Sequence, residues 1–289
     1  MSVDVLIPSV FGTGFEKNLK NELVLDKLSA TKYADNLKKG DELDVELPGM
    51  VTLTDWDGSD LTDPEKIAAS TVKVKVNKGK AVNFELDEAK VAQIDGADDD
   101  KAIALADEYS QDGVHQFAEA VDLEIGKLYP VAGIYKEGES GAAIVLTKDN
   151  VGNMLSVMKA EFQRAKAWKS GKMGAFLPPE ISALMNQVPG LLNTETGMKQ
   201  REAGYVGKLA GWQIFESNNI ASDTDGNLYP LFGVLGETTA SVKQRKLKLH
   251  HYMREKSLNQ AFKGAGVFGT GCPRPDKLGT IKAKVTLSI

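Results

Sequence analysis

The stretch DDDKAIALADEYSQDGVHQFAEAVDLEIGKL, residues 98–128, is the most regular part of the sequence. Apolar residues recur in it every three or four positions, as on one face of an α-helix; they are Ile103, Ala106, Val114, Phe117, Val121, Ile125 and Leu128. Three aspartates at its start suit the positive end of a helix dipole, and Pro130 would end the helix. Within the helix, only Gly113 lowers helix stability, by about 1 kcal/mol relative to alanine. The stretch therefore predicts a helix about 45 Å long, the spine of its domain.

Two segments before this helix alternate between apolar and charged residues. They are DELDVEL at 41–47 and TVKVKVNK at 71–78, and such alternation is typical of strands with one buried face. Antiparallel pairing would place Glu42, Asp44 and Glu46 opposite Lys73, Lys75 and Lys78, which favours the pair over like-charged alternatives. We therefore predict a β-hairpin, after which Val82, Phe84 and Leu86 indicate that a strand resumes.

The two hairpin strands are separated by PGMVTLTDWDGSDLTDPEKIAAS, residues 48–70. Loops of this length are uncommon inside a compact domain and are usually functional or disordered. This loop has more apolar residues than a free linker would have: Met50, Val51, Leu53, Trp56, Leu61 and Ile67. We expect the loop to dock on another molecule. The alternative is a tip that folds back on its own core.

The rest of the chain mixes helices and strands without a regular βαβ order. Periodicity predicts a second helix from about Lys148 to Ser170, with Gly171 just past its end. GAFLPPE, residues 174–180, is typical of a short strand that enters a helix at two prolines. Strand-like segments follow at 205–221, 228–249 and 278–289. Because strands and helices are segregated, the sequence indicates an α+β fold.

The N-terminal region is poor in apolar groups. Phe15, Leu19, Leu23 and Leu28 predict a short amphipathic helix, too small to form a core of its own. We therefore expect a neighbouring molecule to cover residues 1–30, and deletion of residues 2–30 to leave a folded subunit. The start carries no basic n-region, so no signal peptide is expected.

Composition narrows the class of protein. With 42% hydrophobic and 26% charged residues among 289, wholesale disorder is excluded. A net charge of −5 argues against a dedicated nucleic-acid binder. The single cysteine, Cys272, allows no internal disulfide and fits a reducing compartment. No apolar run approaches the roughly 18 residues of a membrane span, so we expect a soluble, intracellularly made protein.

One glycine motif invites a nucleotide-binding interpretation. GAGVFG at 264–269 matches G-x-G-x-x-G, whose chemistry needs a helix opening at its end and an acid about 20 residues later. Here Pro273 and Pro275 follow, and the sequence ends at Ile289. We therefore expect a glycine-rich loop between strands and no cofactor.

No other pattern predicts a catalytic or metal site. His250 and His251 would point to opposite faces of a strand, His115 lies on the long helix, and zinc needs three or four convergent ligands. Asp55–Gly58 and Asp223–Asn227 lack the spacing of calcium loops and are better read as Asx turns. Without a G-x-S-x-G sequence, nothing favours a hydrolase. The basic segments 159–172 and 243–256 are expected to be solvated faces or subunit contacts, in preference to nucleic-acid sites.

The order of these features resembles the major capsid (coat) proteins of tailed bacteriophages, which have the Hong Kong 97-like fold. The resemblance rests on NLKKGDELDVEL at 36–47, the return strand 73–86 followed by DEAKVAQID, the helix ending IGKLYP, REAGYVGKLAGWQIFESNNIA at 201–221 and VFGTGCPRPDKLGTIKAKV at 267–285. It implies an N-terminal arm (1–39), an extended loop (40–86), a peripheral domain with the spine helix (87–172), an axial domain (173–264) and a C-terminal strand segment returning to the peripheral domain (265–289).

The resemblance also implies a function. Such a protein is not an enzyme, and self-assembles into hexamers and pentamers of an icosahedral virion head enclosing double-stranded DNA. Implied partners are other copies of the chain, a separate scaffolding protein, a portal, DNA contacted non-specifically and a decoration protein, with assembly in the host cytoplasm and no membrane. No lysine–asparagine–glutamate set for covalent cross-linking is matched, so none is predicted, and we expect no long N-terminal scaffolding segment that is cleaved. The alternatives are an encapsulin-type nanocompartment, which would bind a cargo peptide, and a soluble enzyme with a glycine-rich site.

Overall fold

The computed structural model describes residues 23–30, 42–47, 51, 53, 55, 63, 66–67, 70–86, 99–187, 205–245, 250–253 and 260–285. Their contacts divide the chain into two compact units. The first unit includes residues 80–118 and 246–266, and the second includes 21–79, 119–245 and 267–289. Helices and strands do not alternate as βαβ repeats, so the predicted α+β class is confirmed.

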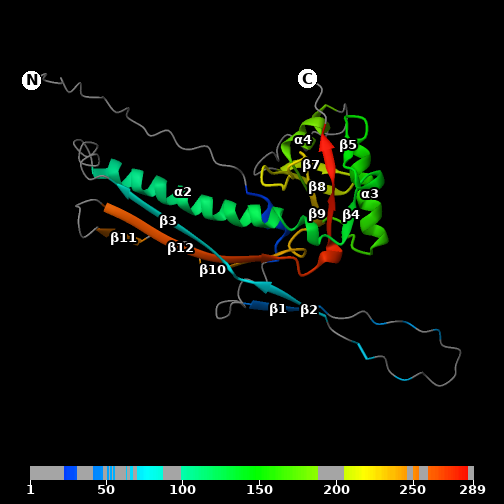
Figure 1. Ribbon diagram of the computed structural model, residues 1–289, viewed down its shortest axis with the longest axis horizontal. Helices are drawn as coiled ribbons and strands as arrows, with labels where there is room; N and C mark the ends of the chain where they lie inside the picture. The colour runs from blue at the N-terminus through cyan, green and yellow to red at the C-terminus, as the bar shows by residue number, and fades with distance from the viewer. Residues whose placement is uncertain are drawn as a thin grey trace, which may run out of the picture. The chain divides into compact units, whose positions relative to one another are not determined.

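In the first unit, the N-terminal part of helix α2 (Asp99–Gly126) lies along strands β3 (Lys78–Leu86) and β12 (Gln260–Gly271) (Figure 1). Strands β3 and β11 (His250–Met253) both pair with β12. Phe84 stacks on Phe262 with ring centroids 5.0 Å apart and meets Tyr109 at 5.6 Å. The predicted long helix and the resumed strand are therefore confirmed.

The described part of α2 departs from the predicted stripe at Val114, and Leu128 lies beyond the end of the helix. Val114 is 48% exposed, whereas Gly113 is buried. A Cβ on Gly113 would lie 3.3 Å from Val82 Cγ1, so the missing side chain lets the strand approach the helix there. Phe117, Val121 and Ile125 are buried as predicted. The glycine that lowers helix propensity thus serves packing.

The second unit is built on a six-stranded mixed sheet (Figure 1). Its order is β4 (Ile134–Lys136), β13 (Leu278–Ile281), β9 (Leu231–Val234), β6 (Met173–Leu177), β8 (Trp212–Glu216) and β7 (Tyr205–Leu209). A parallel pair joins β5 (Ile144–Leu146) to β14 (Ala283–Val285), and β10 (Ala240–Arg245) pairs with β12. Single 3-10 turns, η3 (Tyr129–Val131), η4 (Glu139–Gly141) and η5 (Pro275–Lys277), lie in the connections.

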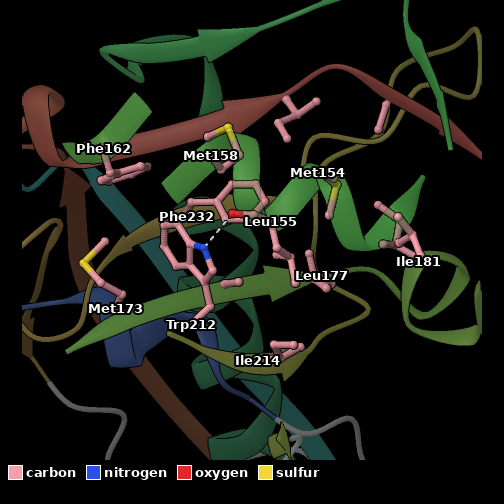
Figure 2. Packing of buried hydrophobic residues seen from close by; sticks show 14 of the residues in the cluster. Met154, Leu155, Met158, Phe162, Met173, Leu177, Ile181, Trp212, Ile214 and Phe232 are labelled. Atoms are coloured by element: carbon pink, nitrogen blue, oxygen red, sulfur yellow. Dashed lines mark hydrogen bonds between the residues drawn. The ribbon is translucent and has the colours of Figure 1, made fainter. Parts of the chain in front are cut away.

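Helices α3 (Val151–Arg164) and α4 (Pro179–Asn186) cover one face of this sheet. Figure 2 shows Trp212 at the centre of the core, where its Nε1 donates a hydrogen bond to the Leu155 carbonyl oxygen at 3.0 Å. The rings of Phe162 and Phe232 meet the Trp212 ring edge-on, each with centroids 5.3 Å away. The strand that enters α4 at Pro178 and Pro179 is confirmed.

Helix α3 ends six residues earlier than predicted. Lys166 adopts a left-handed backbone (φ +55°), and the Ala167 N–H donates to the Phe162 carbonyl at 2.8 Å. Together with the Lys166 N–H bond to Gln163 at 3.1 Å, this forms a Schellman cap. Ala165 is exposed, and Gly171 (φ +77°), expected just past the helix end, belongs to the following turn.

Residues 24–30, which include the 3-10 turn η1 (Leu25–Leu28), cover the other face of the sheet. A Cβ on Gly233 would lie 2.9 Å from Leu28 Cδ2, and Lys27 Nζ lies 4.3 Å from the centre of the Phe215 ring. The Leu28 carbonyl accepts hydrogen bonds from Thr238 and Thr239. Val24, Leu25 and Leu28 are fully buried.

The expectation that a neighbour covers residues 1–30 is therefore wrong for this segment, because the chain's own sheet buries it. Phe15 and Leu19 lie outside the described residues. Instead of the predicted amphipathic helix at Leu28, the structure has a single 3-10 turn.

The five expected segments remain a prediction, but the cores group the chain differently. Helix α3, expected in a peripheral domain ending at 172, shares one core with β6 and β8. Strand β13, expected to return to that peripheral domain, pairs with β9 in the same sheet. A local sequence pattern does not reveal which segments join one core.

Candidate subunit-interaction surface

The predicted hairpin is present as β1 (Glu42–Leu47) and β2 (Ser70–Lys75), paired antiparallel. Glu42 lies opposite Lys75, and Asp44 lies opposite Lys73, as in the predicted acid-to-base pairing. The third pair is wrong: Glu46 lies opposite Thr71, because the register that places Glu42 opposite Lys75 leaves Lys78 beyond the end of β1.

Charges on the exposed face of the hairpin form a small network. Glu42 carboxylate oxygens lie 3.2 Å from Lys75 Nζ and 3.6 Å from Lys73 Nζ. Asp44 is 4.0 Å from Lys73 Nζ. The hydrogen bond and charge of Lys75, followed by the charge of Lys73, lower the pKa of Glu42. All four side chains are at least 43% exposed, so the network contributes little to stability.

Lys78 pairs with Glu124 of helix α2 instead of with the hairpin. Glu124 also accepts from Lys127 at 3.1 Å. Burial alone would raise the pKa of Glu124, but the hydrogen bonds of Lys78 and Lys127 outweigh it and lower the pKa. This pair ties the chain just after β2 to the helix.

The base of the hairpin packs on a small apolar cluster of its own unit. Val45, Val74, Val76 and Ala240 are buried there, with Val267 packed against them. Strand β12 passes so close that a Cβ on Gly269 would lie 2.3 Å from the Lys75 carbonyl oxygen. A Cβ on Gly271 would lie 2.9 Å from Val74 Cγ2.

The loop beyond the hairpin exposes apolar side chains where the structure describes it. Leu53 is 94% exposed, Val51 69% and Ile67 51%. Met50, Trp56 and Leu61 lie outside the described residues. The alternative of a tip folded back on its own core finds no support at the three described positions, and docking of the loop stays a prediction.

The G-x-G-x-x-G stretch lies inside strand β12, so the expected loop is wrong. No helix opens after it, because the chain continues as a strand to Gly271. Packing explains two of its three glycines: a Cβ on Gly266 would lie 2.3 Å from Phe117 Cε2 in the first unit, and Gly269 faces the hairpin in the second.

The other candidate residues are dispersed. His250 is exposed on β11, His115 lies on α2, and Cys272 is a buried free thiol whose pKa burial raises to about 12. Across the described part of the chain, no three His, Cys, Asp or Glu side chains form a group that could hold a metal. No described helix is long and apolar enough to cross a membrane.

The Asx turn predicted at Asp223 is confirmed. The Asp223 carboxylate accepts from the backbone N–H groups of Asp225 (3.0 Å) and Asn227 (2.8 Å) and from the Tyr229 hydroxyl (2.9 Å). The side chain of Asn227 also donates to it, and these hydrogen bonds lower the pKa of Asp223 to about 2. The similar Asp55–Gly58 segment lies outside the described residues apart from Asp55.

Sequence reasoning missed one buried polar network. Asp122 of α2 is 1% exposed and accepts from Asn219 Nδ2 at 3.0 Å and from the Asp26 N–H at 3.1 Å. The Asp26 carboxylate in turn accepts from the Ser241 hydroxyl. An aspartate at a position next to the buried Val121 was the available signal.

Comparisons with known proteins bear on the fold. No protein-family model and no curated protein matches the sequence. Solved structures do match over nearly the whole chain. A chain of Mycobacterium phage Che8 superposes with a TM-score of 0.74 at 18% identity, over 96% of this chain and 98% of that one.

Two further matches are a chain of the capsid of the cyanophage P-SCSP1u (TM-score 0.68, 14% identity, 97% and 94% covered) and one of the capsid of Ralstonia phage GP4 (0.67, 9%, 100% and 100%). Identities this low establish the fold alone. The chain has the α+β fold of tailed-bacteriophage capsid proteins, the Hong Kong 97-like fold that the order of its sequence features resembles.

Proposed function

We propose that this chain is a major capsid protein that self-assembles into the icosahedral head of a tailed bacteriophage. The observation that carries the proposal is the match to capsid chains over nearly the full length of both proteins, with TM-scores of 0.68 and 0.67 for chains of two named capsids.

A structural role, without enzymatic activity, agrees with the residues present. Within the described residues, no three His, Cys, Asp or Glu side chains form a group that could hold a metal. The hairpin and its exposed apolar loop residues offer a contact for a second copy of the chain, since burying exposed leucine and valine side chains would stabilise such a contact.

The finer partners belong to the same proposal. They are hexameric and pentameric capsomers of this chain, a separate scaffolding protein, a portal, non-specifically contacted double-stranded DNA and a decoration protein, assembled in the host cytoplasm into the virion. A net charge of −5 suits weak contact with DNA in place of tight, specific binding.

Sedimentation velocity with negative-stain electron microscopy tests the proposal on the expressed full chain. We expect closed shells of megadalton mass. A protein that remains a monomer or small oligomer, with or without a scaffolding protein supplied, would refute it. Shells that retain a peptide cargo and never carry DNA would favour the encapsulin-type alternative.

A further inference from the structure

Strand β12 presents a face of small residues to the base of the β1–β2 hairpin. Alternate residues of a strand share one face, and here they are Val267, Gly269 and Gly271. Val267 joins the apolar cluster under the hairpin, and the two glycines lie against β2 itself. Neither glycine has a left-handed backbone, so their role is to leave space.

The two glycines leave space for different atoms. A Cβ on Gly269 would meet main-chain atoms only: the Lys75 carbonyl oxygen at 2.3 Å, Val76 Cα at 2.8 Å and the Lys75 carbonyl carbon at 2.9 Å. A Cβ on Gly271 would meet the Val74 side chain, from 2.9 Å. Only the second conflict can be relieved by shortening a neighbouring side chain.

Of the two elements that meet here, β12 is the more firmly held. β12 is held by β10, where Gly269 lies opposite Val242 and Gly271 opposite Ala240. A two-stranded hairpin is marginally stable by itself, and its exposed ion pairs add little. A side chain added to β12 would therefore displace β2 rather than β12.

We propose that Gly269 and Gly271 are positioning residues that set the direction in which the hairpin leaves the second unit. Through the hairpin they set where its apolar loop is presented to a neighbouring copy, a consequence that rests on the proposed function. In this proposal the two glycines act on assembly through the position of the hairpin.

A distance measurement on the unassembled subunit tests the direction itself. Spin labels on Glu46→Cys in β1 and Lys284→Cys in β14 measure the distance between the hairpin and β14. Both positions are exposed and lie in the second unit. Cys272 is 6% exposed with its pKa raised to about 12, so it should remain unlabelled.

We expect Gly269→Ala to shift or broaden the distance distribution by several ångströms. Gly271→Ala should shift it less, and Val74→Ala added to Gly271→Ala should restore it, whereas Val74→Ala added to Gly269→Ala should not. Gly79→Ala is the matched control, because a Cβ there meets nothing within 4 Å. An unchanged distribution in Gly269→Ala, or no restoration by Val74→Ala, would overturn the proposal; should Gly269→Ala not fold, the Gly271 pair decides.

Shell yield then tests the consequence for assembly. Gly269→Ala should form few closed shells even at temperatures well below its thermal unfolding midpoint. Ile214→Val, a core substitution that lowers stability without touching the hairpin, should still form them. If the native chain forms no shells, the proposed function fails, and the distance measurement still decides whether the glycines set the direction of the hairpin.

Discussion

At the scale of single residues, Lys166 has a strained backbone that no sequence pattern predicts. A non-glycine residue in the left-handed region costs about 1–2 kcal/mol, and Lys166 sits there to complete the cap of α3. Lys166→Gly removes this strain and should raise the free energy of unfolding by up to about 1 kcal/mol. The gain is smaller than the strain itself, because glycine also has more conformational freedom in the unfolded chain. Urea denaturation measures it, with Lys166→Ala as the control that keeps the strain. A less stable Lys166→Gly would contradict this account.

Asp122 makes the stability of the second unit depend on pH. Burial raises the pKa of its carboxyl, although hydrogen bonds from Asn219 and from the backbone of Asp26 and Leu25 act to lower it. The nearby charge of Asp26 raises the pKa further. The folded state therefore binds this proton more tightly than the unfolded chain does.

The sign of the effect follows from that difference. Asp122 contributes increasing stability as the pH falls through its raised folded pKa, and the contribution is complete below the ordinary value of 3.8. We expect the native chain to gain stability relative to Asp122→Asn when the pH is lowered from 7 to 4. Urea unfolding of both proteins at several pH values measures the difference, in which carboxyls shared by both, such as Asp223, cancel. If the difference in the free energy of unfolding between the two proteins is constant or shrinks on acidification, the raised pKa of Asp122 does not control the pH dependence of stability.

At the scale of elements, the charges of the hairpin specify its pairing more than its stability. Lys73→Glu with Lys75→Glu would place like charges opposite Asp44 and Glu42, at about 0.2–1 kcal/mol per pair. The subunit should fold while backbone amides of β1 and β2 exchange faster with deuterium. Adding Glu42→Lys and Asp44→Lys should restore protection. Equal exchange in all three proteins would show that the charges do not matter.

The segment 24–30 behaves as part of the sheet's core. Leu28→Ala should lower the free energy of unfolding by about 2–5 kcal/mol, because it empties a fully buried site against β9. Deletion of residues 2–30 is accordingly expected to unfold the second unit. Thermal unfolding measures both, and a stability loss below about 1 kcal/mol for Leu28→Ala would place the segment outside the core.

At the scale of the whole molecule, Leu53 is the counterpart of Leu28. It is 94% exposed in the subunit, so Leu53→Ala should leave the unfolding midpoint unchanged. If the loop docks on a neighbouring copy, the same substitution should reduce the yield of closed shells several-fold, measured by sedimentation velocity. Wild-type yield from Leu53→Ala combined with Val51→Ala would show that this part of the loop makes no assembly contact.

The sequence by itself determined the elements whose signals are local. The period of two over 41–47, the three- and four-residue steps of α2 and α3, and the two prolines at the start of α4 act through backbone geometry within a few residues. The alternation of both segments, with an acidic face on one and a basic face on the other, predicted an antiparallel hairpin, and Glu42 lies opposite Lys75 in the structure.

Tertiary structure decided what each element meets. It buried Gly113 in place of Val114, paired Lys78 with Glu124, placed the glycine motif inside β12 and laid residues 24–30 on the sheet. Each outcome depends on a segment distant in the chain, such as Val82 beside Gly113 or Lys75 beside Gly269. A periodic pattern specifies that a face is to be buried, but only the assembled chain specifies the surface against which it packs.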